Sequence, residues 1–149
     1  MDIYLDTLLH LPFATVESFR EIDDFIYLKI GLINEEIFCP HCQKKITEIH
    51  QTEYVLIRDL SVFGRKVYLK VPRRQFYCSD CHKYSTEKLE FIEWRHRYTC
   101  RYEESVYEKV KNTSIEQVGR EEELSRDIVQ SIFNHVEEKK SETGDILKE

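Results

Sequence analysis

The chain has 149 residues, of which 41% are hydrophobic, and this proportion is enough for a packed core and excludes wholesale disorder. Its first residues, MDIYLDTLLH, lack the basic segment and the cleavage site of a signal peptide, and no apolar run approaches the roughly 20 residues that cross a bilayer. We therefore expect a soluble, cytoplasmic protein of one or two small domains, without a membrane partner.

The net charge of −6 is unevenly distributed along the chain. Residues 58–101 carry 11 basic and 5 acidic side chains, whereas the segments on either side are acidic. A local basic patch matters more for phosphate binding than the charge balance of the whole chain. The central third is therefore a candidate DNA-binding surface, although the same lysines and arginines could instead serve only to solvate a β-sheet.

Short strands are predicted over most of the first two-thirds of the chain. A short helix over residues 2–10 precedes a hairpin over residues 14–33, which has a charged turn. The segment EYVLIRDL is a further strand, and Gly64 marks the turn into KVYLKV, which alternates between apolar and polar side chains. We expect Pro72 to interrupt this strand, because proline cannot donate a backbone hydrogen bond.

The apolar period becomes helical after Thr99. Three helices are predicted at about 101–111, 114–121 and 125–140, and the polar residues beyond them are expected to fray. Ser114 is a suitable N-cap for the middle helix, with a glutamine three residues later that could complete a capping box.

The cysteines carry the strongest functional signal. Five of them in a chain without a secretory signal indicate metal binding or redox chemistry rather than disulfides. Four form two C-x-x-C pairs, Cys39 with Cys42 and Cys78 with Cys81, separated by 35 residues. Tetrahedral Zn²⁺ needs four such ligands, and two tight turns supply them. The alternative, thioredoxin-like exchange, needs one pair in a βαβ context that the pattern does not show.

The sequence thus predicts an α+β chain with a structural zinc ion. A small, β-rich zinc ribbon is expected over residues 1–95, followed by a three-helix, helix-turn-helix-like segment over residues 96–149 with a frayed C-terminal tail. His41 and His82 lie beside the cysteines, but four thiolates already complete the ligand set.

The stretch QVGREEELSRDIVQSIF has the spacing of a helix-turn-helix. Its second helix would bury Ile128, Ile132 and Val136 and present other side chains to a major groove. Glu123 stands in the turn where φ is often positive, and the acidic run Glu121 to Glu123 lies where phosphates would approach. A three-helix bundle that packs against another part of the protein is the alternative.

Beyond these patterns, the chain resembles a known family. The order FCPHC, then YVLIRDLSVFGRKVYLKVPRRQFYCSDC, then the Trp94–Thr99 region and the helix-turn-helix resembles the N-terminal part of ISL-three-type insertion-sequence transposases, over residues 1 to about 140. The stretch RDLSVFGRKVYLKVPRRQFYC is particularly similar to that family's zinc-ribbon segment. The resemblance implies recognition of terminal inverted repeats during transposition, with a following DDE domain that performs the DNA recombination.

Only nine residues follow Lys140, whereas a catalytic domain needs on the order of 100. We therefore expect no enzyme, but a zinc-dependent DNA-binding module that resembles the end-recognition region of a truncated transposase. Double-stranded DNA is the expected partner, and a homodimer is a candidate assembly. The alternative function is a protein-interaction module that uses acidic helices on a zinc-ribbon scaffold.

The predicted DNA contacts are basic and amide side chains from three parts of the chain. They come from the basic central strand, from the segment before the helices and from the recognition helix. They are Arg65, Lys66, Lys70, Arg73, Arg74, Arg95, Arg97, Arg126, Gln130 and Asn134.

Overall fold

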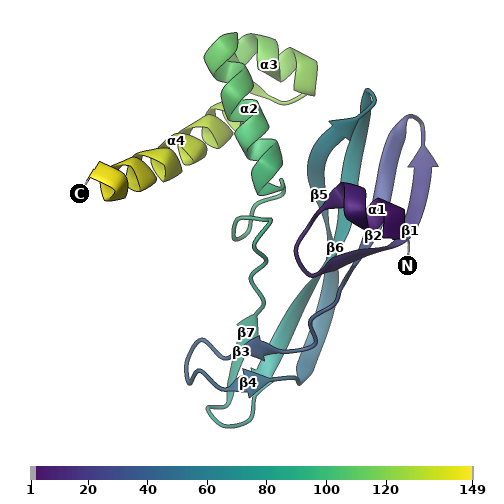
Figure 1. The fold of residues 1–149 in the computed structure, drawn as a ribbon, viewed down its shortest axis with the longest axis vertical. Helices are drawn as coiled ribbons and strands as arrows, with labels where there is room; N and C mark the ends of the chain where they lie inside the picture. Colours follow the sequence, from purple (N-terminus) through teal and green to yellow (C-terminus); the bar gives the residue numbers. More distant parts are fainter. Residues whose placement is uncertain (1–2, 149) are drawn as a thin grey trace. The chain divides into compact units, whose positions relative to one another are not determined.

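The computed structural model describes residues 3–148 and divides into two compact units, Met1–Thr99 and Cys100–Glu149. The first unit is rich in β-strands and the second is helical, so the predicted α+β class is confirmed (Figure 1). The boundary between the units lies after residue 99, whereas the sequence analysis placed it between residues 95 and 96.

The first unit contains a five-stranded sheet and a small two-stranded one. Its elements are α1 (Ile3–Leu9), β1 (Ala14–Ile22), β2 (Phe25–Leu32), β3 (Ile37–Phe38), β4 (Lys45–Ile46), β5 (Ile49–Val62), β6 (Arg65–Cys78) and β7 (Lys83–Thr86). The large sheet has the strand order β1-β2-β6-β5, with β7 paired to the far end of β6, and β2 pairs with β6 in parallel (Figure 1). The predicted first helix, the predicted hairpin over residues 14–33 and the predicted turn at Gly64 are present.

Strand β6 buries opposite faces at its two ends. Val67, Leu69 and Val71 are buried in the core of the large sheet, whereas Phe76 and Cys78 are buried in a second cluster with Cys39 and Ile46. Successive side chains of a strand point to opposite faces, so these odd-numbered and even-numbered positions face opposite ways. One 14-residue strand therefore supports two separate cores.

The expectation that Pro72 interrupts the strand is wrong, because β6 runs through it. Pro72 pairs with Tyr54 of β5 on one side. On the other side, β2 pairs only as far as Lys70 and β7 only from Gln75 onward. Proline is tolerated here because it lies where one edge of the strand has no neighbouring strand.

Helix α1 is held against the sheet by Asp6. The carboxylate of Asp6 accepts hydrogen bonds from the Val16 backbone N–H at 2.6 Å and from the Thr15 hydroxyl at 2.7 Å. These two donors lower the pKa of the Asp6 carboxyl. Leu5 and Leu9 on this helix pack on the core of the sheet.

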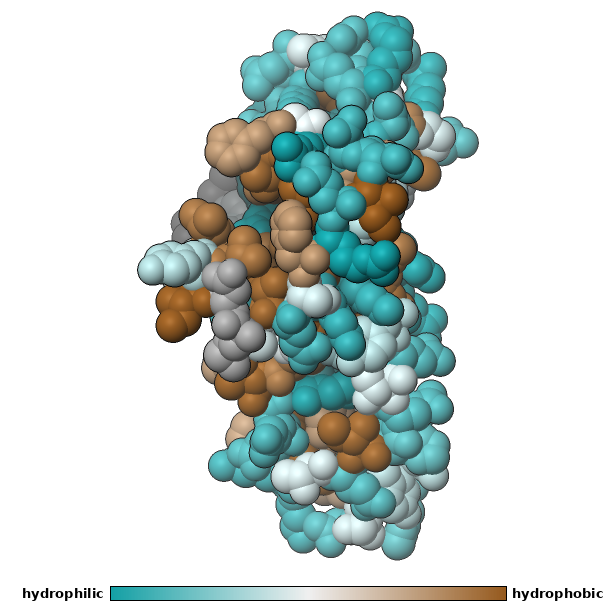
Figure 2. Space-filling view, turned by 90° about the vertical axis from the view of Figure 1, so that its right-hand side faces the viewer, coloured by the Kyte–Doolittle hydropathy of each residue, from teal (hydrophilic) through white to brown (hydrophobic). Residues whose placement is uncertain are grey.

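The opposite side of α1 is apolar and exposed. Ile3 is 74% exposed and Leu8 is 81% exposed. Figure 2 shows hydrophobic side chains gathered in one part of this face of the molecule.

The second unit consists of three helices, as predicted: α2 (Cys100–Asn112), α3 (Ile115–Glu122) and α4 (Arg126–Lys148). Residues 141–148, which were expected to fray, are the last part of α4. The Ser114 hydroxyl caps α3 by accepting from the Gln117 backbone N–H at 3.1 Å. The capping box is not completed, because the Gln117 side chain bonds to Glu121 and Arg120 instead. No helix in residues 3–148 is long and apolar enough to cross a membrane.

A buried ion pair links β6 to the segment after β7, and it generates a prediction on stability. Arg74 donates two hydrogen bonds to the carboxylate of Glu87, at 2.8 and 2.7 Å, and both side chains are almost fully buried. We expect Glu87→Ala to lower the free energy of unfolding by about 3–5 kcal/mol, because it leaves an uncompensated buried charge. Urea denaturation measures this loss.

The matched control is Glu36→Ala, which removes a surface ion pair to Lys45. Exposed pairs contribute about 0–1 kcal/mol, so this variant should unfold close to the unmodified chain. Equal losses for the two variants would contradict the assignment of the Arg74–Glu87 pair as a structural element.

Candidate zinc centre and nucleic-acid interface

The two C-x-x-C pairs occupy two equivalent turns. The backbone N–H of Gln43 bonds to the carbonyl of Cys39, and that of His82 bonds to the carbonyl of Cys78, both at 2.8 Å. Gln43 and His82 both have positive φ, 68° and 58°, which is uncommon for residues with a side chain. The short strands β3 and β4 flank the first turn, and β6 and β7 flank the second. Each cysteine pair therefore sits at the tip of its own hairpin.

The four thiols converge on one point. The Sγ atoms of Cys39 and Cys81 are 3.6 Å apart, as are those of Cys42 and Cys78, and all four lie within 4.8 Å of one another. Zinc–sulfur bonds of about 2.3 Å in a tetrahedron place neighbouring sulfur atoms about 3.8 Å apart. The donor type, number and spacing therefore fit a structural zinc ion.

Burial acts on the protonation of these thiols. Burial is the main cause that raises the pKa of Cys81 to about 12, and the neighbouring thiols of Cys78 and Cys39 contribute to the same shift. Burial also acts to raise the pKa of Cys39, but backbone N–H donors from Cys42 and His41 outweigh it and lower that pKa to about 7. A bound dication would stabilise the thiolates that burial disfavours, so metal binding here must release protons.

The second unit has the geometry of a helix-turn-helix. Val118 of α3 and Val129 of α4 are fully buried and pack the unit. A Cβ atom on Gly119 would lie 2.9 Å from the backbone oxygen of Leu124, so the turn approaches this glycine closely. Glu123 has φ 56° and ψ 45°, which is the left-handed conformation predicted for the turn.

The recognition helix differs from the prediction at Ile128. This side chain is 39% exposed, and the buried stripe of α4 is instead Val129, Ile132 and Val136. Ile132 and Val136 are buried as predicted, and only Ile128 is replaced in the stripe, by its neighbour Val129, because residues 129, 132 and 136 have the i, i+3, i+7 spacing of one helix face.

The three predicted base-reading side chains occupy one stretch of α4. Arg126 and Asn134 are exposed and Gln130 is half-buried. The Gln130 amide donates to the Asn134 side-chain oxygen at 2.9 Å, and Arg126 pairs with Glu116 of α3 at 3.1 Å.

The acidic run before α4 is less repulsive than the sequence indicated. Glu122 is buried, and its carboxylate accepts hydrogen bonds from the Tyr102 hydroxyl at 2.9 Å and the Lys109 ammonium at 2.6 Å. It therefore holds α2 and α3 together. Glu121 accepts from Gln117 on the surface of α3.

The five predicted contacts on β6 do not form one surface. Lys66 and Lys70 point to the face opposite the core, whereas Arg65 and Arg73 share the parity of the buried valines and point the other way. Arg74 does not belong with the predicted DNA contacts, because its guanidinium is buried against Glu87 and is not presented to a phosphate. Arg65 pairs with Glu21 at 3.1 Å.

Lys66 and Lys70 lie on what we call the aromatic–basic face. Tyr27 and Tyr68 stack with ring centroids 5.6 Å apart, and Lys66 lies over the ring of Phe25. Lys29 and Lys70 both lie over the ring of Tyr54. The aromatic–basic face comprises Phe25, Tyr27, Lys29, Tyr54, Lys66, Tyr68 and Lys70. The aromatic members of this face were not predicted from the sequence, although they alternate with buried residues along their strands.

Arg95 and Arg97 precede the helices, and both are exposed. The carbonyl of Arg97 accepts from the Arg58 backbone, so this segment runs along β5. Arg95 instead lines a cavity together with Arg73, although the two residues are distant in sequence. Trp94 and Lys88 also line it, and neither was singled out from the sequence as a ligand-binding residue.

Comparisons with known proteins agree with both sites. Residues 35–81 match the family model described as the zinc-finger of transposase IS204/IS1001/IS1096/IS1165. Residues 87–137 match the helix-turn-helix domain of transposase family ISL3. Two stretches of the chain are thus similar to the zinc-ribbon and helix-turn-helix domains of ISL3 transposases. The predicted family resemblance is therefore confirmed.

A curated relative supports the same assignment. The chain is 28% identical over 107 residues to the transposase for insertion sequence element IS1001 of Bordetella parapertussis. The alignment covers 72% of this chain but 26% of the relative, so the chain spans about a quarter of that transposase. No solved structure matches the chain.

The four-cysteine geometry predicts one equivalent of zinc per chain. We expect Cys78→Ser to abolish stoichiometric zinc binding and to lower the thermal stability of the first unit, because three thiolates leave the tetrahedron incomplete. Metal analysis and thermal denaturation measure the two effects. Cys100→Ser is the control, since Cys100 lies outside the cluster and should leave one equivalent bound. A chelator-treated chain that melts like the metal-loaded chain would refute the structural role.

Proposed function

We propose that this chain is a zinc-dependent DNA-binding module, and that it acts as the end-recognition region of an ISL3-type transposase without catalysis of its own. The observation that carries the proposal is the pairing of a four-thiol centre with a helix-turn-helix in one chain. The zinc ion would be structural, because four thiolates fill the tetrahedron and leave no position for substrate.

The helix-turn-helix is the proposed reader of sequence. Arg126, Gln130 and Asn134 project from the first turns of α4, and this is the part of a recognition helix that reaches base edges. Arginine and amide side chains match the donor and acceptor patterns of the major groove. The proposed target is double-stranded DNA, with the terminal inverted repeats of an insertion element as the specific site. A homodimer on two such sites, in the cytoplasm, is part of the proposal.

The aromatic–basic face is the proposed contact to the DNA backbone. Its rings pack against one another and under the lysine side chains, and the face presents ammonium groups and tyrosine hydroxyls beside these rings. These are donors to phosphate oxygens and carry no sequence information. The face would therefore supply affinity, and α4 would supply specificity.

Specificity can be tested at Gln130. We expect Gln130→Ala to lose about 1–3 kcal/mol of discrimination between a preferred duplex and a scrambled duplex of the same composition, because a bidentate base contact is lost. The preferred duplex is obtained by selection from a random pool, and titration of each duplex measures the two affinities.

Glu138→Ala, which alters an exposed position further along α4, should keep the full preference. If the unmodified chain shows no preference for any selected duplex, α4 packs without reading bases. The selected sequence is expected to match the ends of an insertion element.

Backbone contact can be tested by charge reversal on the aromatic–basic face. We expect the double variant Lys66→Glu, Lys70→Glu to weaken binding to all duplexes alike and to reduce the salt slope by about 2, or about 1 for each lysine. The control is Lys44→Glu, Lys45→Glu, since both lysines already pair with carboxylates. An unchanged salt slope would remove this face from the interface. Binding of a protein partner with no affinity for DNA would favour the protein-interaction alternative.

A further inference from the structure

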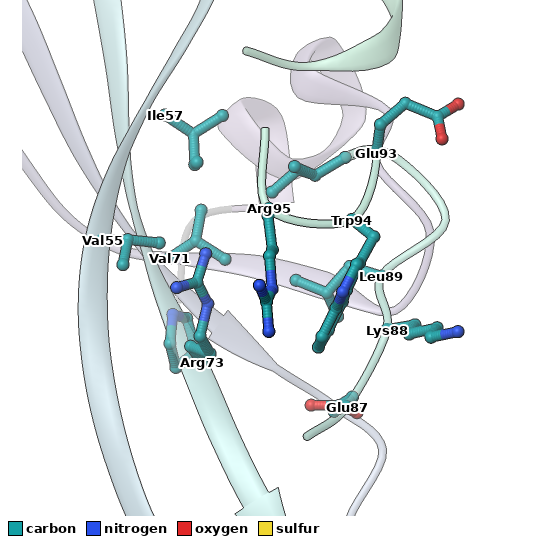
Figure 3. Close-up of a pocket in the computed structure, with 12 residues that line it drawn as sticks. Val55, Ile57, Val71, Arg73, Glu87, Lys88, Leu89, Glu93, Trp94 and Arg95 are labelled. Carbon is teal, nitrogen blue, oxygen red and sulfur yellow. The ribbon is translucent and has the colours of Figure 1, made fainter. Parts of the chain in front are cut away.

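The first unit contains a cavity of about 290 Å³ between the sheet and the segment that follows β7 (Figure 3). Its floor is apolar and comes from β5, β6 and residues 89–92. The aliphatic lining residues are Val55, Ile57, Val71, Pro72, Leu89 and Ile92. A volume of this size holds a single planar ring system rather than a chain of several residues.

Three cationic side chains line the cavity, and Figure 3 shows that of Lys88 pointing away from Arg73 and Arg95. Arg73, Lys88 and Arg95 all line the cavity, and none of them makes an ion pair within the described residues. Figure 3 shows Arg95 projecting between Arg73 and the ring of Trp94. The Arg95 guanidinium lies 5.7 Å and the Lys88 ammonium 5.5 Å from the centroid of the Trp94 ring.

The two carboxylates near the cavity do not neutralise these cations. Glu87 is held by Arg74 and also accepts from Asn34 at 3.0 Å. Figure 3 shows the Glu93 carboxylate pointing away from Arg73 and Arg95. Like charges that converge without a counter-ion are relieved by an anionic ligand.

The backbone at Arg95 is also unusual. Its φ is 66°, in the left-handed region that residues with a side chain rarely adopt. Such conformations persist where the surrounding structure imposes them, and they cluster at ligand-binding sites. Here the conformation directs the guanidinium into the cavity beside Trp94.

We propose that this cavity binds one unpaired nucleotide of DNA, with its base on the apolar floor against Trp94 and its phosphate on Arg73 and Arg95. A nucleotide combines the two properties that the cavity requires, a planar ring system and a negative charge. A base inside a duplex cannot enter, because it is stacked and paired on both sides, so the ligand is a single-stranded or extruded nucleotide. The inference rests on the proposed DNA-binding function and adds a third contact, made by residues other than those of α4 and the aromatic–basic face.

Trp94 is the only tryptophan of the chain, so its fluorescence reports directly on the cavity. The probe is a short single-stranded oligonucleotide, compared with an abasic oligonucleotide of the same number of phosphates. We expect the first to quench Trp94 and to bind about tenfold more tightly than the second, since stacking of one base contributes roughly this factor.

The double variant Arg73→Gln, Arg95→Gln should weaken binding of the oligonucleotide about tenfold more than binding of a blunt duplex. Arg126→Gln is the matched control, with the same change in α4. It should weaken the duplex complex and leave the quenching of Trp94 by the oligonucleotide intact. Urea denaturation of each variant separates loss of binding from loss of folding.

Equal affinity for the normal and abasic oligonucleotides would overturn the proposal, as would saturation without a change in Trp94 fluorescence. Duplex binding without quenching by the oligonucleotide removes the cavity and leaves the proposed function standing. If the chain does not bind duplex DNA, the proposed function is refuted, and the oligonucleotide titration still tests whether the cavity binds a nucleotide.

Discussion

The reversal of the buried face along β6 is the constraint on which the first unit depends. Val71 faces the core of the large sheet, and Phe76 faces the cysteine cluster on the opposite side of the same strand. The change occurs around Pro72, where β6 has β5 as its one strand neighbour. Because one strand serves two cores, the position of Cys78 is tied to the register of β6 against β5. The sheet therefore places half of the zinc ligands.

Two acidic side chains in the second unit hold helices together and are not merely solvated at the surface. Glu122 binds Tyr102 and Lys109, and Glu137 accepts from the Tyr107 hydroxyl at 2.6 Å. The bond from Glu137 raises the pKa of Tyr107 to about 12, because it stabilises the protonated hydroxyl. A net negative unit can thus carry a recognition helix, since part of its negative charge is directed inward or paired.

Positive charge in the first unit is arranged in three chemically different ways. The Arg74 guanidinium is buried with a carboxylate, and the lysines of the aromatic–basic face lie over aromatic rings. Arg73 and Arg95 instead converge on an apolar cavity. Cation–π contacts hold a cation in place without neutralising it, whereas an ion pair does both. Lys70 over the Tyr54 ring and the arginines at the cavity are therefore available to an anion, and Arg74 is not among them.

Local features of the sequence were sufficient for the cysteine pairs, the strand and helix periods, the Ser114 cap and the positive φ of Glu123, because each depends on residues a few positions apart. The strands β3 and β4 were missed, since two residues are too short for a period-2 signal. The tertiary structure decided that Arg74 is buried, that Ile128 is exposed and that Arg73 and Arg95 line the same cavity. They depend on which distant segments pack together, and a short window of sequence holds no information about its partner across a sheet or beside a cavity.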